Sequence, residues 1–205
     1  MIKKIITLFL FCFMVGAIMT LPAYAVTYIF QPNPVDMQDL PHEKYYLWKE
    51  TLNLPSGEYI TGATLLFKQI YNNESGTLFT HLLDNPNSSG WNSVSQDLWW
   101  KSDTNGGGDN FLNQGILIGQ FSYVGSPQDL TYDFSASQIQ TLSSYIADNG
   151  VFGFGIDPDC HYYNNYIKFT VTTCPGQIPE PATMFLLGSG LIGLAGLARR
   201  KFRRN

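Results

Sequence analysis

The sequence has 205 residues, of which 44% are hydrophobic and 14% are charged, and its net charge at pH 7 is −4. All 16 acidic residues lie between residues 26 and 180, where five lysines and no arginine leave a net charge of −11. This acidic balance excludes a nucleic-acid-binding protein, which needs a basic surface for the phosphate backbone.

The first 25 residues have the pattern of a secretory signal peptide. Two lysines precede an apolar run over residues 5–21, and Ala23 and Ala25 stand at the small-x-small positions of a cleavage site. We therefore expect export through the Sec pathway and cleavage before Val26. Residues 26–177 would then be the exported domain, whose length suits one domain with a sizeable core.

Short β-rich runs separated by Gly, Pro, Asn, Asp and Ser dominate this domain. Their number and spacing predict an all-β fold, an antiparallel β-sandwich for which we favour a jelly roll over a closed barrel. Alternation places Tyr46 and Trp48 on one face of their strand, and Ala63, Leu65 and Tyr71 on one face of theirs. In chain order, we expect strands at 27–30, 45–54, 60–71, 78–83, 94–100, 115–124, 130–134, 151–157 and 166–173.

One helix interrupts the strands. Ser135 and Gln138 have the spacing of a capping box, and the apolar residues that follow recur at helical intervals. Asn149 and Gly150 end the pattern, with Gly150 suited to a left-handed C-terminal cap. We expect this short helix to cover one end or edge of the sheets.

The segment DPDCHYYN, residues 157–164, is the most distinctive stretch of the domain. Its hard oxygen ligands suit Ca²⁺, with Asp157, Asp159 and Asn164 as tentative ligands of a structural ion. The alternative is an Asp/Asn-rich turn whose side chains bond backbone groups. A polar Gly/Asp/Asn stretch at 102–110 reads as a surface loop.

We interpret the DPDCHYYN segment as the loop of a hairpin that pairs residues 151–157 with 166–173. Cys160 would lie in the loop and Cys174 at the far end of the returning strand. At ~3.3 Å per residue the two would be roughly 20 Å apart or more, beyond the ~7 Å reach of a disulfide. The hairpin therefore predicts two unpaired thiols.

Aromatic residues provide a second tentative site. Trp91, Trp99, Trp100 and Tyr162 could form a platform for stacking on sugars, although aromatic residues at strand spacing more often belong to the core. Trp99 and Trp100 are adjacent and must point to opposite faces of a strand. We find no GxSxG, HExxH or CxxC motif, so the sequence offers no support for catalysis.

The C-terminal stretch has three ordered parts. Pro179, Glu180 and Pro181 form a stiff extended segment, residues 182–198 are uncharged and mostly apolar, and residues 199–204 are basic and include Arg199 and Arg200. As a helix the apolar run would span about 26 Å, close to the lower limit for crossing a bilayer. The basic end predicts a cytoplasmic C-terminus.

This arrangement over residues 178–205 resembles the PEP-CTERM sorting signal, and the DPDCHYYN segment resembles one that recurs in the exported domains of proteins with that signal. The resemblance implies recognition at Pro179–Pro181 by an exosortase, a membrane-embedded cysteine protease or transpeptidase. It also implies removal of the helix and association with exopolysaccharide or the cell surface.

We therefore expect an exported, non-enzymatic protein that is first held in the inner membrane by its C-terminal helix and then moves to the cell surface or extracellular matrix. One alternative is a carbohydrate-binding jelly-roll module, with or without Ca²⁺. The other is a polysaccharide-active enzyme, because one sequence without a motif does not rule out a glycosidase built on this kind of fold.

Overall fold

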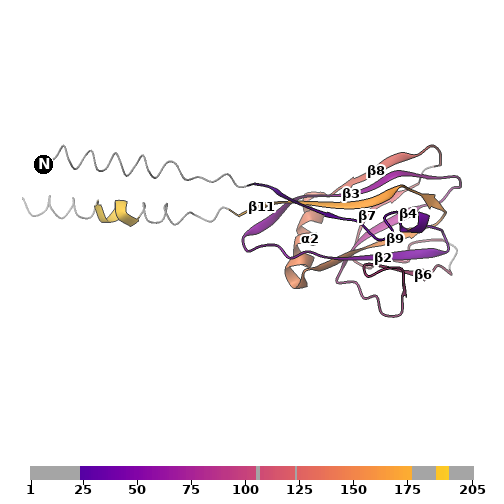
Figure 1. Cartoon of the computed structure of the whole chain (residues 1–205), viewed down its shortest axis with the longest axis horizontal. Helices are drawn as coiled ribbons and strands as arrows, with labels where there is room; N and C mark the ends of the chain where they lie inside the picture. The colour runs from indigo at the N-terminus through magenta and orange to yellow at the C-terminus, as the bar shows by residue number, and fades with distance from the viewer. Residues whose placement is uncertain (1–23, 105–106, 123, 177–187, 194–205) are drawn as a thin grey trace, which may run out of the picture. The chain divides into compact units, whose positions relative to one another are not determined.

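The computed structural model describes residues 24–104, 107–122, 124–176 and 188–193 (Figure 1). Residues Ala25–Pro175 form one compact unit that contains all strands of the described residues. The predicted signal peptide and C-terminal helix lie almost entirely outside the described residues, apart from a helical stretch at residues 188–193.

Within the described part of the chain, no helix combines the length and the apolar character needed to cross a membrane.

One of the two sheets has five strands, all pairing antiparallel. In it β11 (Tyr166–Pro175) lies between β1 (Val26–Phe30) and β3 (Glu58–Asn72). On the side away from β11, β3 pairs with β8 (Gln128–Asp133). The last two residues of β3 pair with the short β10 (Tyr162–Tyr163). The strands β1 and β8 are therefore the two long edges of this sheet.

The second sheet has six antiparallel strands and packs on the first, so the predicted β-sandwich is confirmed (Figure 1). The jelly-roll connectivity stays a prediction. A 3-10 turn, η1 (Met37–Asp39), precedes the first strand of this sheet. In spatial order the six strands are β5 (Asn92–Ser93), β6 (Leu98–Ser102), β2 (Lys44–Thr51), β9 (Val151–Pro158), β4 (Leu78–Asp84) and β7 (Ile116–Phe121).

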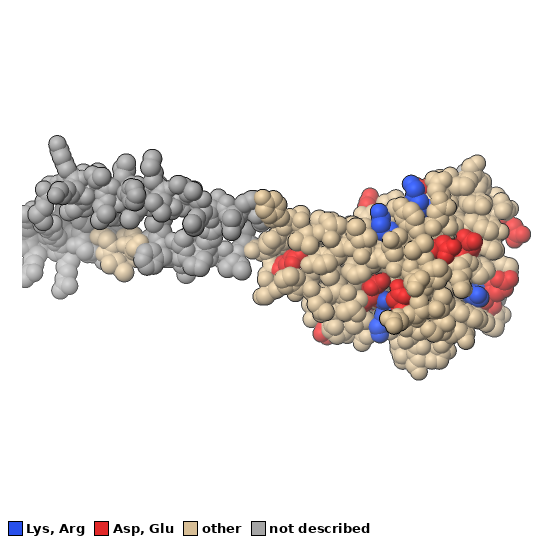
Figure 2. Space-filling model, in the orientation of Figure 1, with Lys and Arg blue, Asp and Glu red and all other residues tan. Residues whose placement is uncertain are grey.

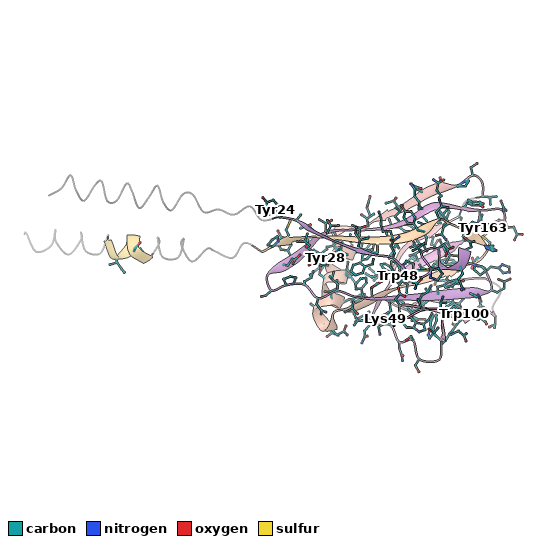
Figure 3. All side chains as sticks on the ribbon, in the orientation of Figure 1. Tyr24, Tyr28, Trp48, Lys49, Trp100 and Tyr163 are labelled. Atoms are coloured by element: carbon teal, nitrogen blue, oxygen red, sulfur yellow. The ribbon has the colours of Figure 1, made fainter. Side chains whose placement is uncertain are left out.

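Aromatic side chains fill the space between the sheets. Phe169 of β11 meets Phe154 of β9 with ring centroids 4.8 Å apart, and Phe154 meets Trp48 of β2 at 5.1 Å. All three side chains are fully buried, and Figure 3 shows Trp48 in the middle of the domain. Because these rings join the two sheets, they supply much of the apolar burial that stabilises the sandwich.

The helix α2 (Ala136–Asn149) confirms the predicted boundaries. The Ser135 side chain accepts a hydrogen bond from the backbone of Gln138, whose side chain accepts one from the backbone of Ser135 at 2.8 Å. Gly150 follows in the left-handed conformation, and its N–H donates to the Ile146 carbonyl at 2.9 Å. Leu142 and Ile146 are buried, so the helix contributes to the main core.

The predicted hairpin between residues 151–157 and 166–173 is wrong. Strand β9 pairs with β2 and β4 in the six-stranded sheet, whereas β11 pairs with β1 and β3 in the other sheet. The segment between them crosses from one sheet to the other, because both strands bury apolar side chains against the shared core. Both cysteines are nevertheless free, as predicted, with Cys160 buried and Cys174 partly exposed.

The predicted face of Tyr71 is also wrong. Gln69 has a positive φ of 55°, and the pairing of β3 with β8 is irregular between Phe67 and Ile70. After this bulge Ile70 and Asn72 are buried, and Tyr71 is on the opposite face from Phe67. One extra residue in a strand reverses the alternation that follows.

Candidate functional site

The two aspartates of the DPD sequence hold a loop against the end of β9. The Asp157 Oδ2 atom accepts a hydrogen bond from the backbone N–H of Asn110 at 2.6 Å. The Asp159 Oδ1 atom accepts one from the backbone N–H of Gly108 at 2.7 Å. The polar stretch at residues 102–110, which we expected to be a surface loop, is therefore hydrogen-bonded to the DPDCHYYN segment.

Beyond these bonds the loop places Phe111 on the outer face of the six-stranded sheet. The Phe111 ring lies over Gly155, where an added Cβ atom would stand 2.6 Å from the ring, so only glycine leaves it room. Phe111 also contacts Tyr45, with ring centroids 5.6 Å apart. With neighbouring side chains it forms a second, smaller core, the outer cluster, made of Leu47, Leu83, Phe111, Tyr45, Trp91 and Trp99.

A buried histidine fixes the other side of the same loop. His81 Nε2 lies 2.8 Å from Asp109 Oδ2, and His81 Nδ1 lies 3.2 Å from the Gln114 carbonyl oxygen. His81 thus contacts residues 109 and 114 of the loop through its two ring nitrogens, and the side chains of His81 and Asp109 are both nearly buried.

Asp157 is the most perturbed carboxylate of this region. Its side chain is fully buried, and its Oδ1 atom has no hydrogen-bond partner among the described residues. The pKa of Asp157 is raised from 3.8 to about 7, mainly by burial; the hydrogen bonds from Asn110 lower it, and the negative charges of Asp103 and Asp159 contribute to the increase. A carboxyl group with this pKa exchanges its proton near neutral pH.

The three residues predicted as calcium ligands each bond a different backbone group. Asp157 and Asp159 bond backbone amides of the loop, whereas Asn164 donates to the Asp36 carbonyl at 2.9 Å. Over the described ranges of the chain, no three side chains of His, Cys, Asp or Glu are grouped so as to hold a metal ion. The hydrogen bonds of both aspartates agree with the alternative interpretation, a turn that satisfies backbone groups, and calcium binding stays a prediction.

The four residues predicted to stack on sugars do not all lie in one cluster. Trp91 and Trp99 belong to the outer cluster, whereas Trp100 packs against the main core and has the Lys44 Nζ atom 4.6 Å from its ring centroid. Trp99 and Trp100 do point to opposite faces, as predicted. Tyr162 corrects the prediction, because its side chain is fully buried and its hydroxyl donates to the Gly76 and Phe121 carbonyls.

Sequence analysis missed a stack of three rings beside Tyr162. Tyr163 stacks on its cross-strand partner Tyr71 with centroids 5.0 Å apart, and His161 stacks on Tyr163 at 4.3 Å. All three side chains are partly exposed, and Figure 3 shows Tyr163 at the periphery of the domain. The bulge at Gln69 creates this stack by turning Tyr71 outward, and no pattern in the sequence marked the bulge.

The C-terminal stretch matches a known sorting motif. A family profile described as the PEP-CTERM protein-sorting motif matches residues 177–204. The chain ends in a PEP-CTERM sorting motif. No curated protein shows a significant match to the chain.

The PEP-CTERM motif includes every tail residue that sequence analysis singled out, namely Pro179, Glu180, Pro181, Arg199 and Arg200. These residues, like Ala23 of the predicted signal cleavage site, lie outside the described residues. The motif implies an exported protein that is sorted by an exosortase. It begins two residues after Pro175, the last residue of β11, so the folded domain ends close to the sorting motif.

Proposed function

We propose that this chain is a non-enzymatic surface or matrix protein, whose β-sandwich domain is exported through Sec and delivered by exosortase processing. The observation that carries the proposal is the PEP-CTERM motif at residues 177–204. In this proposal the signal peptide is cleaved before Val26, and residues 182–198 hold the protein in the inner membrane with the C-terminus in the cytoplasm. Processing then removes the helix and passes the domain, a jelly roll, to the exopolysaccharide matrix.

Substitution within the motif tests the sorting step. Glu180 is the only charged residue between Lys168 and Arg199, and it lies inside the Pro-Glu-Pro sequence. We expect Glu180→Ala to block processing. Fractionated cells should then contain a heavier form in the inner membrane. The matched control is Gln177→Ala, a polar residue just before Pro-Glu-Pro. Normal processing of the Glu180→Ala protein would refute recognition through this residue.

The non-enzymatic role is supported by what the buried polar side chains do. Asp157, Asp159 and Asp109 each accept hydrogen bonds from loop backbone groups, and His81 pairs with Asp109. These groups thus act in positioning residues 107–114. The proposal predicts that the purified protein leaves exopolysaccharide intact, and release of sugars from it would favour the polysaccharide-active enzyme instead.

A second candidate function is carbohydrate binding, and the partly exposed stack of Tyr71, Tyr163 and His161 favours it. Aromatic rings bind the apolar faces of sugars, and the acidic domain would prefer a neutral glycan. A glycan array with the wild-type protein and Tyr163→Ala, each with and without chelator, tests this function. Glycan binding that depends on calcium, and that is lost in Asp157→Ala and Asp159→Ala, would support the predicted calcium site.

A further inference from the structure

Glu58 is a carboxylate at the end of the five-stranded sheet where β1 begins. The Tyr28 hydroxyl donates to Glu58 Oε1 at 3.3 Å, and the hydroxyl of Thr173, which is fully buried, donates to the same oxygen. The pKa of Tyr28 is raised by partial burial and by the negative charge of Glu58. Over the ranges that the structure describes, Glu58 takes part in no ion pair. Its charge is therefore held by hydroxyl groups alone.

The first residue of β1 belongs to the same network. Val26 lies opposite Thr173, and its carbonyl oxygen is 3.3 Å from the Thr173 Oγ1 atom. The nitrogen and the carbonyl oxygen of one residue point to the same side of an extended strand, so the Val26 nitrogen also faces β11. Along this path the nitrogen is at most roughly 9 Å from Glu58 Oε1, and the three side-chain torsions of Glu58 can close that distance.

We propose that the α-ammonium group formed by cleavage before Val26 makes an ion pair with Glu58. Before cleavage, the Val26 nitrogen is part of a neutral peptide group. Hydrolysis of the Ala25–Val26 bond consumes one water and gives a carboxylate on Ala25, which leaves with the signal peptide, and an ammonium group on Val26, which stays at the start of β1. The inference rests on the proposed function, which places the cleavage before Val26.

The charges around Glu58 favour this partner. Residues 25–175 contain 15 acidic residues and five lysines, and acidic side chains are spread over the face drawn in Figure 2. Glu58 is the only charged side chain among those that line the groove beside it. The other titratable side chains near the start of β1 are those of Tyr28, Tyr59 and Cys174, and none of them is a carboxylate. Cleavage therefore adds a cation beside a carboxylate that lacks one, and ties β1 to β3 across β11.

The pKa of the Val26 amino group tests the pairing. The mature chain, residues 26–205, is purified in detergent after removal of a fusion partner that leaves Val26 as the first residue. Acetylation of the amino group is followed by mass spectrometry between pH 6 and pH 10. A free α-amino group has a pKa of about 7.7–8.0, and a neighbouring carboxylate raises it. We expect an increase of about one unit, and so a roughly tenfold slower acetylation at pH 7 than in the urea-unfolded chain.

A pair of variants identifies the carboxylate. Glu58→Gln keeps an acceptor for the hydroxyls of Tyr28 and Thr173 but removes the charge, so the pKa of the Val26 amino group should return to its ordinary range. Glu74→Gln, at an exposed position beyond the other end of β3, is the matched control and should leave the pKa raised. Shielding alone does not imitate the effect, because burial lowers the pKa of an amino group.

Two outcomes overturn the pairing. One is an ordinary pKa for the Val26 amino group in the folded wild-type chain, and this measurement needs no substitution. The other is the same raised pKa in wild type and in Glu58→Gln. N-terminal sequencing of the exported protein separates this failure from that of the proposed function. A first residue other than Val26 overturns the cleavage site and the ion pair together, whereas Val26 with an ordinary pKa overturns the ion pair alone.

Discussion

Replacement of Asp157 by asparagine should make the domain more stable at pH 8. The Asp157 side chain is fully buried, with one oxygen bonded to the Asn110 backbone N–H and the other without a partner among the described residues. Asparagine has nearly the same shape, and its carbonyl oxygen can keep the bond to Asn110. The substitution therefore removes the charge of the buried carboxylate and replaces its oxygen without a partner by an NH2 group.

The magnitude follows from the pKa of Asp157, which burial raises from 3.8 to about 7. Between these values the folded protein keeps a proton that the unfolded chain has lost, so stability decreases as the pH rises from about 4 to about 7. At about 1.4 kcal/mol per pH unit, this loss is at most about 4 kcal/mol. The NH2 group of asparagine takes the place of the oxygen without a partner, and leaving it unbonded costs about 1–3 kcal/mol, so we expect a net gain of about 1–3 kcal/mol at pH 8.

Urea unfolding of both proteins at several pH values between 4.5 and 8 measures the effect. Burial also raises the pKa of Glu50 to about 7, so Glu50 contributes to the pH dependence of both proteins. Its contribution cancels in the difference in unfolding free energy between Asp157→Asn and wild type. This difference should grow with pH. Asp148→Asn, at an exposed position near the end of α2, is the control and should leave stability unchanged at every pH. A difference for Asp157→Asn that does not change with pH would refute the reasoning.

Three further predictions concern other parts of the domain. Ser135→Ala removes the capping box of α2 and should lower the unfolding free energy by about 1 kcal/mol in urea, whereas Ser135→Asn should largely retain it. Gly155→Ala places a methyl group against the Phe111 ring and should cost about 1–3 kcal/mol; the cost should shrink in a Phe111→Ala background, and an equal cost there would argue against this contact. A maleimide should label Cys174 in the folded protein and Cys160, which is buried, only after unfolding; equal labelling rates would contradict the burial of Cys160.

The parts of the fold that depend on local chemistry could be predicted from the sequence. The helix began at Ser135 and ended before Gly150 as expected, because its caps are made by residues within a few positions of each other. The alternation that sends Trp99 and Trp100 to opposite faces is equally local. The PEP-CTERM motif was recognisable because its three parts follow one another in a short stretch.

The errors concern contacts between distant residues. Strands β9 and β11 have the composition of a hairpin pair, but alternation does not say which sheet each strand joins. The bulge at Gln69 depends on the pairing of β3 with β8, so the outward orientation of Tyr71 could not be predicted from the alternation of residues in β3 alone. The DPD sequence was noticed, but its role as an acceptor for the amides of Gly108 and Asn110 depends on a loop about fifty residues earlier in the chain.

The place of β11 sets the order in which this domain can fold during export. It is the last strand in the chain, and yet it lies between β1 and β3 and supplies the only backbone pairing that β1 makes in the described sheet. Until residues 166–175 have emerged on the far side of the membrane, β1 has no neighbour in the described sheet, and β3 lacks the partner that it has along residues 58–68. The five-stranded sheet therefore cannot be completed until almost the whole domain has been exported, so most of the chain is exported before this sheet exists.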